Sequence, residues 1–548
     1  MEFSSMRRGG SVARRTLAAL VCLVASGGTV ATADEWWNPA DQAGSDSVLV
    51  SPESTPSQGS FDGMLSDQYS AAPVRPIDQD QDGLSPGPDA GVVDPDLEES
   101  EELDDDTFED KLNAFAERLD SLDEGFEGLE EALDEVDGKA SNKSLVVSGS
   151  SKSTMKISGR VHVDAWGFDT DDDPAMNQFS AGPEDELNRL GFRRLRFGVA
   201  GKVKDNMVYK IEMEFANGND SEFRDAYLGW SDLPFLQKVL VGNQKRPYGL
   251  DHLNSSRYNV FIERPYVIEA FNEDARRLGV QSYGVSDDEA WNWRYGVFNQ
   301  RNVQDEGNYT GDHLQLQVAG RLANTIWYDE TSNGRGYAHW AISGTHADVS
   351  TEDNAESRFR TRPEARTSGT RWLDTGQIDG TDYYNLLGLE GVVNLGSLQI
   401  VGEYQSNWIE RDGFEDLRLD GGYVYASYFL TGEHMPWERD SGTLGRPVPL
   451  ENFWLVDRCN GCRSGGWGAW QLAARYSVAD FSDGADPEFY GGEGQAFTAA
   501  MNWYWNANAR MQFNYITGEI ENSTVGDRAG APVAGNYNIY GARFMIDF

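Results

Sequence analysis

The last nine residues of the chain alternate between two kinds of side chain with a period of two. The apolar face carries Tyr540, Ala542, Phe544, Ile546 and Phe548. The opposite face carries Gly541, Arg543, Met545 and Asp547. A strand that is apolar on one side and charged on the other fits a barrel wall between lipid and a wet lumen. The pattern therefore predicts a closing barrel strand that ends on an aromatic ring.

The same period of two recurs from about residue 154 to the end of the chain. The alternating segments lie near 154–168, 191–203, 206–217, 222–231, 237–244, 275–286, 290–299, 312–321, 336–348, 383–393, 397–409, 419–431, 466–479, 494–506, 508–520 and 537–548. Short turns alternate with the long connections 244–274, 349–382, 432–465 and 521–536, as expected of the two ends of a barrel. Single-chain bacterial barrels have an even number of strands. We therefore predict an all-β fold over 150–548, a transmembrane antiparallel β-barrel of about 16 strands.

The first 33 residues carry an export signal. Arg7, Arg8, Arg14 and Arg15 precede a short apolar run over 17–30, and Ala31-Thr-Ala33 follows as a cleavage site. This order is typical of a secretory signal peptide. Arg14-Arg15 resembles a twin-arginine signal, but a barrel must cross the inner membrane unfolded, so general secretion is the better interpretation. Export together with an amphipathic closing strand predicts the cell outer membrane.

Residues 105–138 follow a heptad pattern. The apolar residues alternate in spacings of four and three, and they are Phe108, Leu112, Phe115, Leu119, Leu122, Phe126, Leu129, Leu133 and Val136. Four heptads in register predict a short α-helical coiled coil, and large Phe residues in its seam favour three strands over two. We expect a homotrimer with this arm in the periplasm. The alternative is a single amphipathic helix lying on its own barrel.

The charge of the chain is concentrated before the barrel. The formal net charge is −44, and residues 34–138 contain 32 acidic residues against Arg75, Lys111 and Arg118. Residues 34–104 show no apolar period and are expected to be a disordered acidic linker. Asp78, Asp80, Asp82 and Asp89 match part of an EF-hand calcium loop, but the bidentate Glu is missing, so a plain acidic linker is the alternative. With no basic face to neutralise phosphates, nucleic acid is not expected as a partner.

The barrel region resembles the phosphate-selective porin O and P family. The resemblance rests on the order of several short motifs over nearly 400 residues: Ile157–Arg160, Phe192–Arg194, Phe223–Ala226, Gly242–Gly249, Glu263-Arg264, Leu430–Glu433 and Asn502–Tyr504. It implies a homotrimeric, sixteen-stranded porin through which small anionic solutes diffuse passively. It also implies lumen positions for Arg160, Arg193 and Arg194 and a constriction position for Arg264.

A row of arginines offers the chemistry that such a pore needs. Arg358, Arg360, Arg362 and Arg366 share one parity, so their guanidinium groups face the same side of an extended chain. Arginine is always charged and binds oxyanions with its planar fork, so a row of them can pass phosphate or carboxylate along a pore. The resemblance places this spacing in the vestibule above the constriction. The alternative is a solvated loop whose arginines pair with Glu352, Asp353, Glu356 and Glu364.

Two positions depart from the family pattern. His252 stands where the family has a Lys of the phosphate site, and Arg224 stands where it has a selectivity-tuning Asp. We expect Arg224 near the narrowest point of the pore. Histidine is mostly neutral at pH 7, so His252 predicts an anion preference that rises as pH falls through about 6.5. The resemblance therefore implies a porin but does not imply phosphate specificity.

The remaining motifs indicate neither an enzyme nor a cofactor. The six His residues are scattered, and HExxH and GxSxG do not occur. Cys459 and Cys462, the two cysteines left once the signal is removed, predict a disulfide across a tight turn in an oxidising envelope, rather than a metal site. A competing function is a structural tether, in which the acidic arm links the barrel to the cell wall.

Overall fold

The computed structural model describes residues 146–150, 153–169, 186–204, 206–217, 221–272, 275–303, 314–349, 357–367, 371–454, 456–459, 462–483, 489–523 and 533–548. The signal peptide, the acidic linker, the calcium candidate and the coiled coil all lie outside these residues, so each of them stays a prediction. Among the described helices, none is long and apolar enough to cross a membrane.

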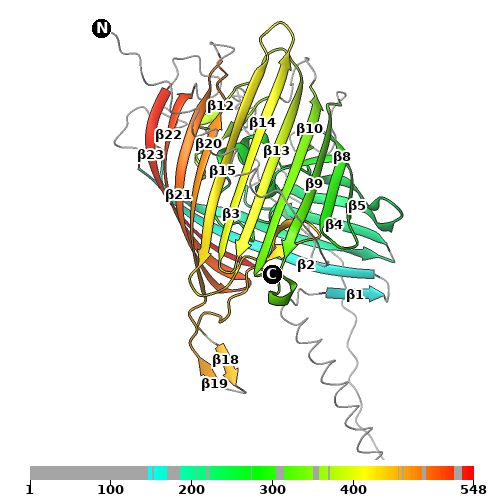
Figure 1. The fold of residues 1–548 in the computed structure, drawn as a ribbon, viewed down its shortest axis with the longest axis vertical. Helices are drawn as coiled ribbons and strands as arrows, with labels where there is room; N and C mark the ends of the chain where they lie inside the picture. Colours follow the sequence, from blue (N-terminus) through cyan, green and yellow to red (C-terminus); the bar gives the residue numbers. More distant parts are fainter. Residues whose placement is uncertain are drawn as a thin grey trace, which may run out of the picture. The chain divides into compact units, whose positions relative to one another are not determined.

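Sixteen antiparallel strands form one closed barrel (Figure 1). Each strand pairs with its neighbours in sequence, and β2 pairs with both β3 and the last strand, β23. The strands are β2 (Ser153–Asp169), β3 (Arg189–Val203), β4 (Met207–Glu214), β5 (Glu222–Leu233), β6 (Gln237–Lys245), β7 (Arg276–Val285), β8 (Trp291–Asn299), β9 (Leu316–Tyr328), β10 (Gly336–Asp348), β13 (Thr381–Leu395), β14 (Leu398–Arg411), β15 (Leu417–Phe429), β20 (Ala469–Asp480), β21 (Gly491–Asn506), β22 (Ala509–Ser523) and β23 (Val533–Asp547). Every predicted segment overlaps one of these strands, so the predicted sixteen-stranded barrel is confirmed.

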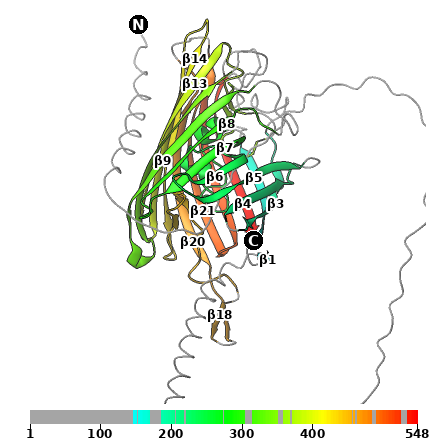
Figure 2. The ribbon, with the colours of Figure 1, turned by 90° about the vertical axis from the view of Figure 1, so that its right-hand side faces the viewer.

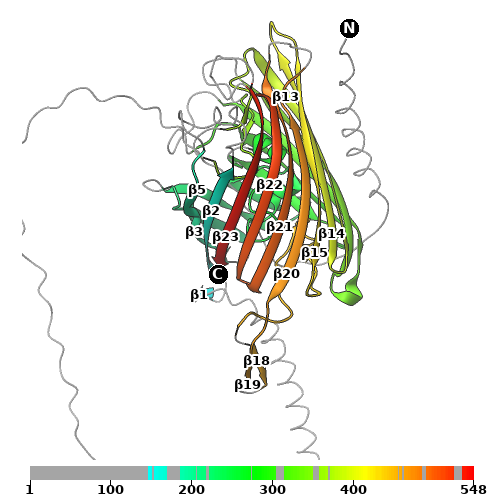
Figure 3. The same ribbon diagram turned by 90° about the vertical axis from the view of Figure 1, so that its left-hand side faces the viewer.

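The first and last strands meet at a seam (Figure 3). The backbone N–H of Gly159 donates to the carbonyl oxygen of Phe548 at 2.9 Å, and the N–H of Phe548 donates back at 3.1 Å. A Cβ atom at Gly159 would lie 2.4 Å from the Phe548 ring, so only glycine fits beneath this terminal aromatic. Before the seam, β1 (Val146–Ser150) forms a hairpin with β2.

The alternation along the strands separates an apolar outer face from a polar lumen. On β4, Met207 and Ile211 are exposed, whereas Lys210, Glu212 and Glu214 are buried. On β23, Tyr540 and Phe544 are exposed and Arg543 is buried. The predicted faces of these strands are confirmed, with the charged side turned inward.

Two β-bulges interrupt this alternation where the lumen carries charge. On β3, His162 pairs with Arg194 and Val163 with Phe192, which leaves Arg193 as an extra residue. On β5, Ile211 pairs with Ala226 and Met213 with Phe223, so Arg224 and Asp225 both lie opposite Glu212. A bulge redirects side chains that strict alternation would place on opposite faces. Both members of each charged pair, Arg193-Arg194 and Arg224-Asp225, therefore form ion pairs or hydrogen bonds inside the barrel.

One side of the barrel has short strands. Strands β4 to β8 contain 8 to 12 residues, whereas β21 to β23 contain 15 or 16. Figure 2 shows this short side. We call β4 to β8 the low wall.

Three connections between strands fold into the lumen. The β6–β7 connection carries α3 (Leu250–Leu253) and α4 (Tyr266–Phe271). The β10–β13 connection carries β11 (Arg360–Thr361) and β12 (Leu373–Asp374), and the β15–β20 connection carries β16 (Trp437–Glu438) and β17 (Thr443–Leu444). Farther along, β18 (Val456–Cys459) and β19 (Cys462–Ser464) form a separate hairpin, and η2 (Glu330–Ser332) lies in the turn after β9.

The β15–β20 connection starts from the end of the barrel that carries the short turns. The backbone N–H of Phe429, its preceding residue, donates to Ser397 in the two-residue turn between β13 and β14. Because strands alternate in direction, the other two inward connections start from the opposite end. The lumen is thus filled from both ends.

Candidate functional site: an arginine-lined lumen

The β6–β7 connection leaves the low wall and forms hydrogen bonds with β2 and β22 inside the barrel. Arg160 on β2 donates to the Ser256 hydroxyl at 2.8 Å. Two strands away around the barrel, Gln512 on β22 donates to the carbonyl oxygens of Asn259 and Val260, both at 3.2 Å. Val260, Ile262 and Tyr266 are almost fully buried. Hydrogen bonds along its whole length therefore hold this segment inside the barrel.

Glu403 fixes the start of α3. This carboxylate comes from β14, and it accepts the backbone N–H groups of Leu250 and Asp251 at 3.0 and 3.1 Å. The first N–H groups of a helix lack partners within the helix, so a carboxylate placed there satisfies them. Tyr423 also donates to Glu403, at 3.0 Å. One wall residue thus determines where the segment enters the lumen.

Glu364 anchors the β10–β13 connection to the barrel wall. Here the carboxylate lies on the connection, and its partners lie on the wall. It is fully buried and accepts from Arg475 at 2.6 Å, from Thr498 at 2.8 Å and from Ser477. Its φ of 58° is left-handed, so it turns the chain at the point where it touches the wall. This strained conformation is maintained by the three hydrogen bonds.

Arginines gather where these two connections meet. Arg193 binds Glu263 with both ends of its guanidinium, at 2.8 and 3.0 Å, and Arg362 binds Glu269 at 3.1 Å. We call the following residues the arginine cluster, because each interacts electrostatically with another member: Arg193, Arg194, Arg362, Arg366, Arg371 and Arg543. By the same criterion, the acids among them are Glu263, Glu269, Asp164 and Glu214. The cluster therefore has more guanidinium groups than carboxylates.

Arg366 is a member of the cluster with a guanidinium nitrogen that is buried and unsatisfied among the described residues. Its side chain is half-buried, and its Nη1 atom has no hydrogen-bond partner among the described residues. Its nearest cations are Arg193 and Arg371, and its nearest acids are Glu263 and Glu269. An oxyanion is the complementary group for an unsatisfied guanidinium N–H.

The predicted row of arginines is extended over a short stretch only. Strand β11 covers Arg360 and Thr361, and the left-handed Glu364 interrupts the chain before Arg366. Arg358 binds Asp374 with two hydrogen bonds of 2.8 Å, while Arg362 turns to Glu269. Of the acids named in the solvated-loop alternative, Glu364 pairs with Arg475 on the wall, and the other three lie outside the described residues.

Other predicted site residues belong to separate clusters. Arg160 binds Glu212 at 3.1 Å, and Arg224 binds Glu222 at 2.7 Å. Arg264 donates to the backbone oxygens of Asp251 and Asn254 at 2.8 and 3.3 Å, which closes the turn after α3. Arg194, a member of the arginine cluster, also contacts His162 at 3.0 Å.

His252 lies on α3, outside the spanning strands. It is buried and stacks on Tyr248, with its Nε2 atom unpartnered among the described residues. Burial and the nearby cations Lys245, Arg264, Arg246 and Arg276 hold the pKa of His252 well below its usual value. The structure thus moves the expected protonation of His252 to lower pH.

As far as His252 is concerned, anion preference is therefore expected to stay constant as pH falls from about 8 through the ordinary His range at about 6.5, since the ring remains neutral there. Reversal potentials in a salt gradient across this range test the expectation, with His252→Gln as the uncharged control. A rise in anion preference near pH 6.5 that disappears in His252→Gln would contradict it.

The family model for phosphate-selective porin O and P matches residues 155–548, the whole barrel from β2 to the terminal Phe548. The chain belongs to this family. It is accordingly an outer-membrane porin, a channel rather than an enzyme.

The chain is similar to other proteins at low sequence identity. An uncharacterized protein of Caulobacter vibrioides is 26% identical over 411 residues, covering 72% of this chain and 74% of that protein. The anion-selective porin from Comamonas acidovorans is 16% identical with a TM-score of 0.43, covering 72% of this chain and 99% of its own. The trimer form of Vibrio cholerae OmpT is 14% identical with a TM-score of 0.43, covering 72% and 100%.

Several lumen residues of this porin were not among the sequence candidates. Arg371, Arg475 and Arg543 join or anchor the arginine cluster, and Lys245 donates to the backbone oxygens of Leu253 and Asn254 at 3.1 and 3.3 Å. Strand parity could have identified Arg475 and Arg543, because both fall on the polar faces of alternating segments. No local sequence pattern identifies Arg371, because its position depends on how the β10–β13 connection folds inward.

The described residues offer no obvious metal site. Among them, no group of three or more His, Cys, Asp or Glu residues could hold a metal ion. The backbones of Cys459 and Cys462 pair directly across the β18–β19 hairpin. This register agrees with the tight turn expected from the sequence, and the disulfide itself stays a prediction.

Proposed function

We propose that the protein is a porin for passive diffusion of small hydrophilic solutes that favours anions such as phosphate and other small oxyanions. The observation that carries this proposal is the arginine cluster, in which guanidinium groups outnumber carboxylates and Arg366 keeps an unsatisfied N–H. A cationic surface enclosed by low-dielectric walls concentrates anions. The excess of acids in the whole chain is thus not reproduced in this part of the lumen.

The proposed pathway passes the site residues in order of depth. Arg358, Arg360, Arg362 and Arg366 attract anions on the β10–β13 connection. Arg193 and Arg194 lie beside the β6–β7 connection, which itself carries Arg264. Arg160, Arg224 and His252 line the deeper clusters. Phosphate specificity is not part of the proposal, because His252 is neutral and Arg264 is engaged with backbone oxygens.

We further propose that the protein is a homotrimer in contact with outer-membrane lipid, with the acidic coiled-coil arm in the periplasm. Vibrio cholerae OmpT, to which the chain is similar, has a trimer form, which supports this proposal. Attachment of the arm to the cell wall remains the second candidate role, and it is compatible with a conducting barrel.

The function is tested by the reversal potential of purified protein in planar bilayers under a tenfold KCl gradient. We expect discrete channels whose reversal potential is shifted towards the equilibrium potential of chloride. This shift should be smaller at high salt, because screening shortens the reach of the cluster to about 3 Å at 1 M. Cation selectivity at low salt would overturn the anion preference. Absence of any conductance would favour the tether.

A further inference from the structure

Hairpin β16–β17 reaches deep into the lumen from the short-turn end. The Tyr337 hydroxyl donates to the Met435 carbonyl at 3.0 Å, and the Trp437 indole donates to Thr325 at 3.0 Å. Beyond these contacts with β9 and β10, the N–H of Leu444 donates to the Asn254 side chain at 3.0 Å. Asn254 belongs to the β6–β7 connection, which enters from the other end. The two connections therefore meet inside the barrel.

The tip of the hairpin is bound to the low wall and to β9 through its carbonyl groups. Asn292 donates to the Arg439 oxygen at 3.3 Å, and Arg294 donates to the Ser441 oxygen at 3.1 Å. Arg321 donates to the Gly442 oxygen at 2.9 Å and is itself paired with Glu390. These bonds fix the backbone of the tip, so the position of its side chains is determined.

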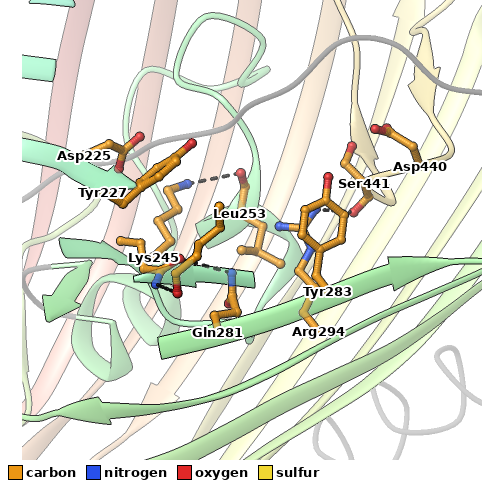
Figure 4. Close-up of a pocket in the computed structure, with 11 residues that line it drawn as sticks. Asp225, Tyr227, Lys245, Leu253, Gln281, Tyr283, Arg294, Asp440 and Ser441 are labelled. Atoms are coloured by element: carbon orange, nitrogen blue, oxygen red, sulfur yellow. Dashed lines mark hydrogen bonds between the residues drawn. The ribbon is translucent and has the colours of Figure 1, made fainter. Parts of the chain in front are cut away.

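A cavity of about 60 Å³ remains between this tip and the low wall (Figure 4). Asp440 and Ser441 line it from the hairpin, and Tyr283, Arg294 and Gln281 line it from the wall. The Oε1 atom of Gln281 is buried without a hydrogen-bond partner among the described residues. Arg294 lies over the Tyr283 ring at 5.0 Å, and Lys238 lies over the same ring at 4.5 Å. Asp440 interacts electrostatically with both cations.

We propose that hairpin β16–β17 is a second filter of the pore, at the short-turn end, and that Asp440 is the residue that opposes anions there. This inference rests on the proposed porin function. The Asp440 carboxylate offsets the positive charge of Arg294 and Lys238, while the unsatisfied amide oxygen of Gln281 offers a further acceptor. A solute that brings a hydrogen-bond donor or a positive group, such as a zwitterion, is better matched to this filter than a bare anion. The pore thus attracts anions at the arginine cluster and discriminates among them at the hairpin.

The test compares Asp440→Asn with wild type in planar bilayers under a KCl gradient. Removing the carboxylate takes away an acid that interacts with both Arg294 and Lys238. The ratio of chloride to potassium permeability is therefore expected to rise about fivefold, the effect of one charge at contact distance in water. Asp412→Asn is the matched control, because Asp412 is exposed in the turn between β14 and β15, at the opposite end. It removes the same charge and should leave the ratio unchanged.

A second variant tests the constriction itself. The N–H of Gly445 donates to the Pro436 oxygen at 2.8 Å, so residues 437–444 can be replaced by two glycines without moving the flanking chain. We expect this variant to conduct severalfold more than wild type. An unchanged permeability ratio in Asp440→Asn, or unchanged conductance in the shortened variant, overturns the second filter. A third outcome separates the two proposals. If wild type is anion-selective and Arg366→Gln reduces that selectivity, while both hairpin variants have wild-type permeability ratio and conductance, the porin proposal stands and the filter alone fails.

Discussion

Replacing Glu364 by Ala is expected to release the β10–β13 connection from the wall and to raise the conductance of the channel. The Glu364 carboxylate is fully buried and balances Arg475 at 2.6 Å. Removing one partner of a buried ion pair costs about 3–5 kcal/mol, because the other charge stays buried without compensation. The left-handed backbone at Glu364 is held by the same contacts. We therefore expect the connection to leave the lumen while the barrel stays closed.

Single-channel recording and protease sensitivity of this connection measure that release. Glu415→Ala is the matched control, because Glu415 is an exposed glutamate in the turn between β14 and β15. Glu364→Gln should have an intermediate effect, since an amide accepts hydrogen bonds but cannot neutralise Arg475. Wild-type conductance and protease resistance in Glu364→Ala would show that other contacts hold the connection.

Neutralising Arg358, Arg360, Arg362 and Arg366 to Gln is expected to shift the reversal potential towards cations and to lower anion conductance. Most of the shift should come from Arg366, whose guanidinium is the least satisfied of the four among the described residues. A unit charge at about 4 Å in water is worth about 1 kcal/mol, or about fivefold in a permeability ratio. Arg366→Gln alone is therefore expected to reduce the ratio of chloride to potassium permeability by about that factor.

Arg366→Lys separates charge from shape in this experiment. Lysine keeps the positive charge but lacks the planar fork, so it should preserve the selectivity for chloride and weaken any preference for oxyanions. Equal selectivity in wild type, Arg366→Gln and the quadruple variant would refute the arginine cluster as the origin of anion preference.

The barrel could be predicted from sequence because its strands follow a local rule. The period of two places Met207 and Ile211 on one face and Lys210 and Glu212 on the other whatever the rest of the chain does. The same rule fails at Arg193-Arg194 and Arg224-Asp225, because a bulge depends on pairing with a neighbouring strand and leaves no local signature.

The type of side chain in the lumen could be predicted from sequence, but the interactions between these side chains could not. The arginines of the lumen could be named from parity and family resemblance, but their partners lie far away in sequence. Glu364 finds Arg475 across 111 residues, and Glu403 binds the start of α3 across about 150 residues. Long connections that fold inward rather than over the surface place these groups together. For the same reason, the sequence did not indicate that the 432–465 connection enters the lumen from the short-turn end.

The ion pairs at the seam bear on the order in which the protein assembles. Asp547, next to the last residue, forms an ion pair with Arg257 of the β6–β7 connection at 2.9 Å and also pairs with Arg446, which follows hairpin β16–β17. Arg543 on the same strand binds both Asp164 of β2 and Glu263. The final strand thus finds its partners on the first strand and on the lumen segments at once. Closure joins residues almost 400 positions apart, the slowest kind of contact to form. Because some of these partners lie on the lumen segments, the last strand acquires its full set of ion pairs only when the lumen segments are docked, so docking stabilises the seam.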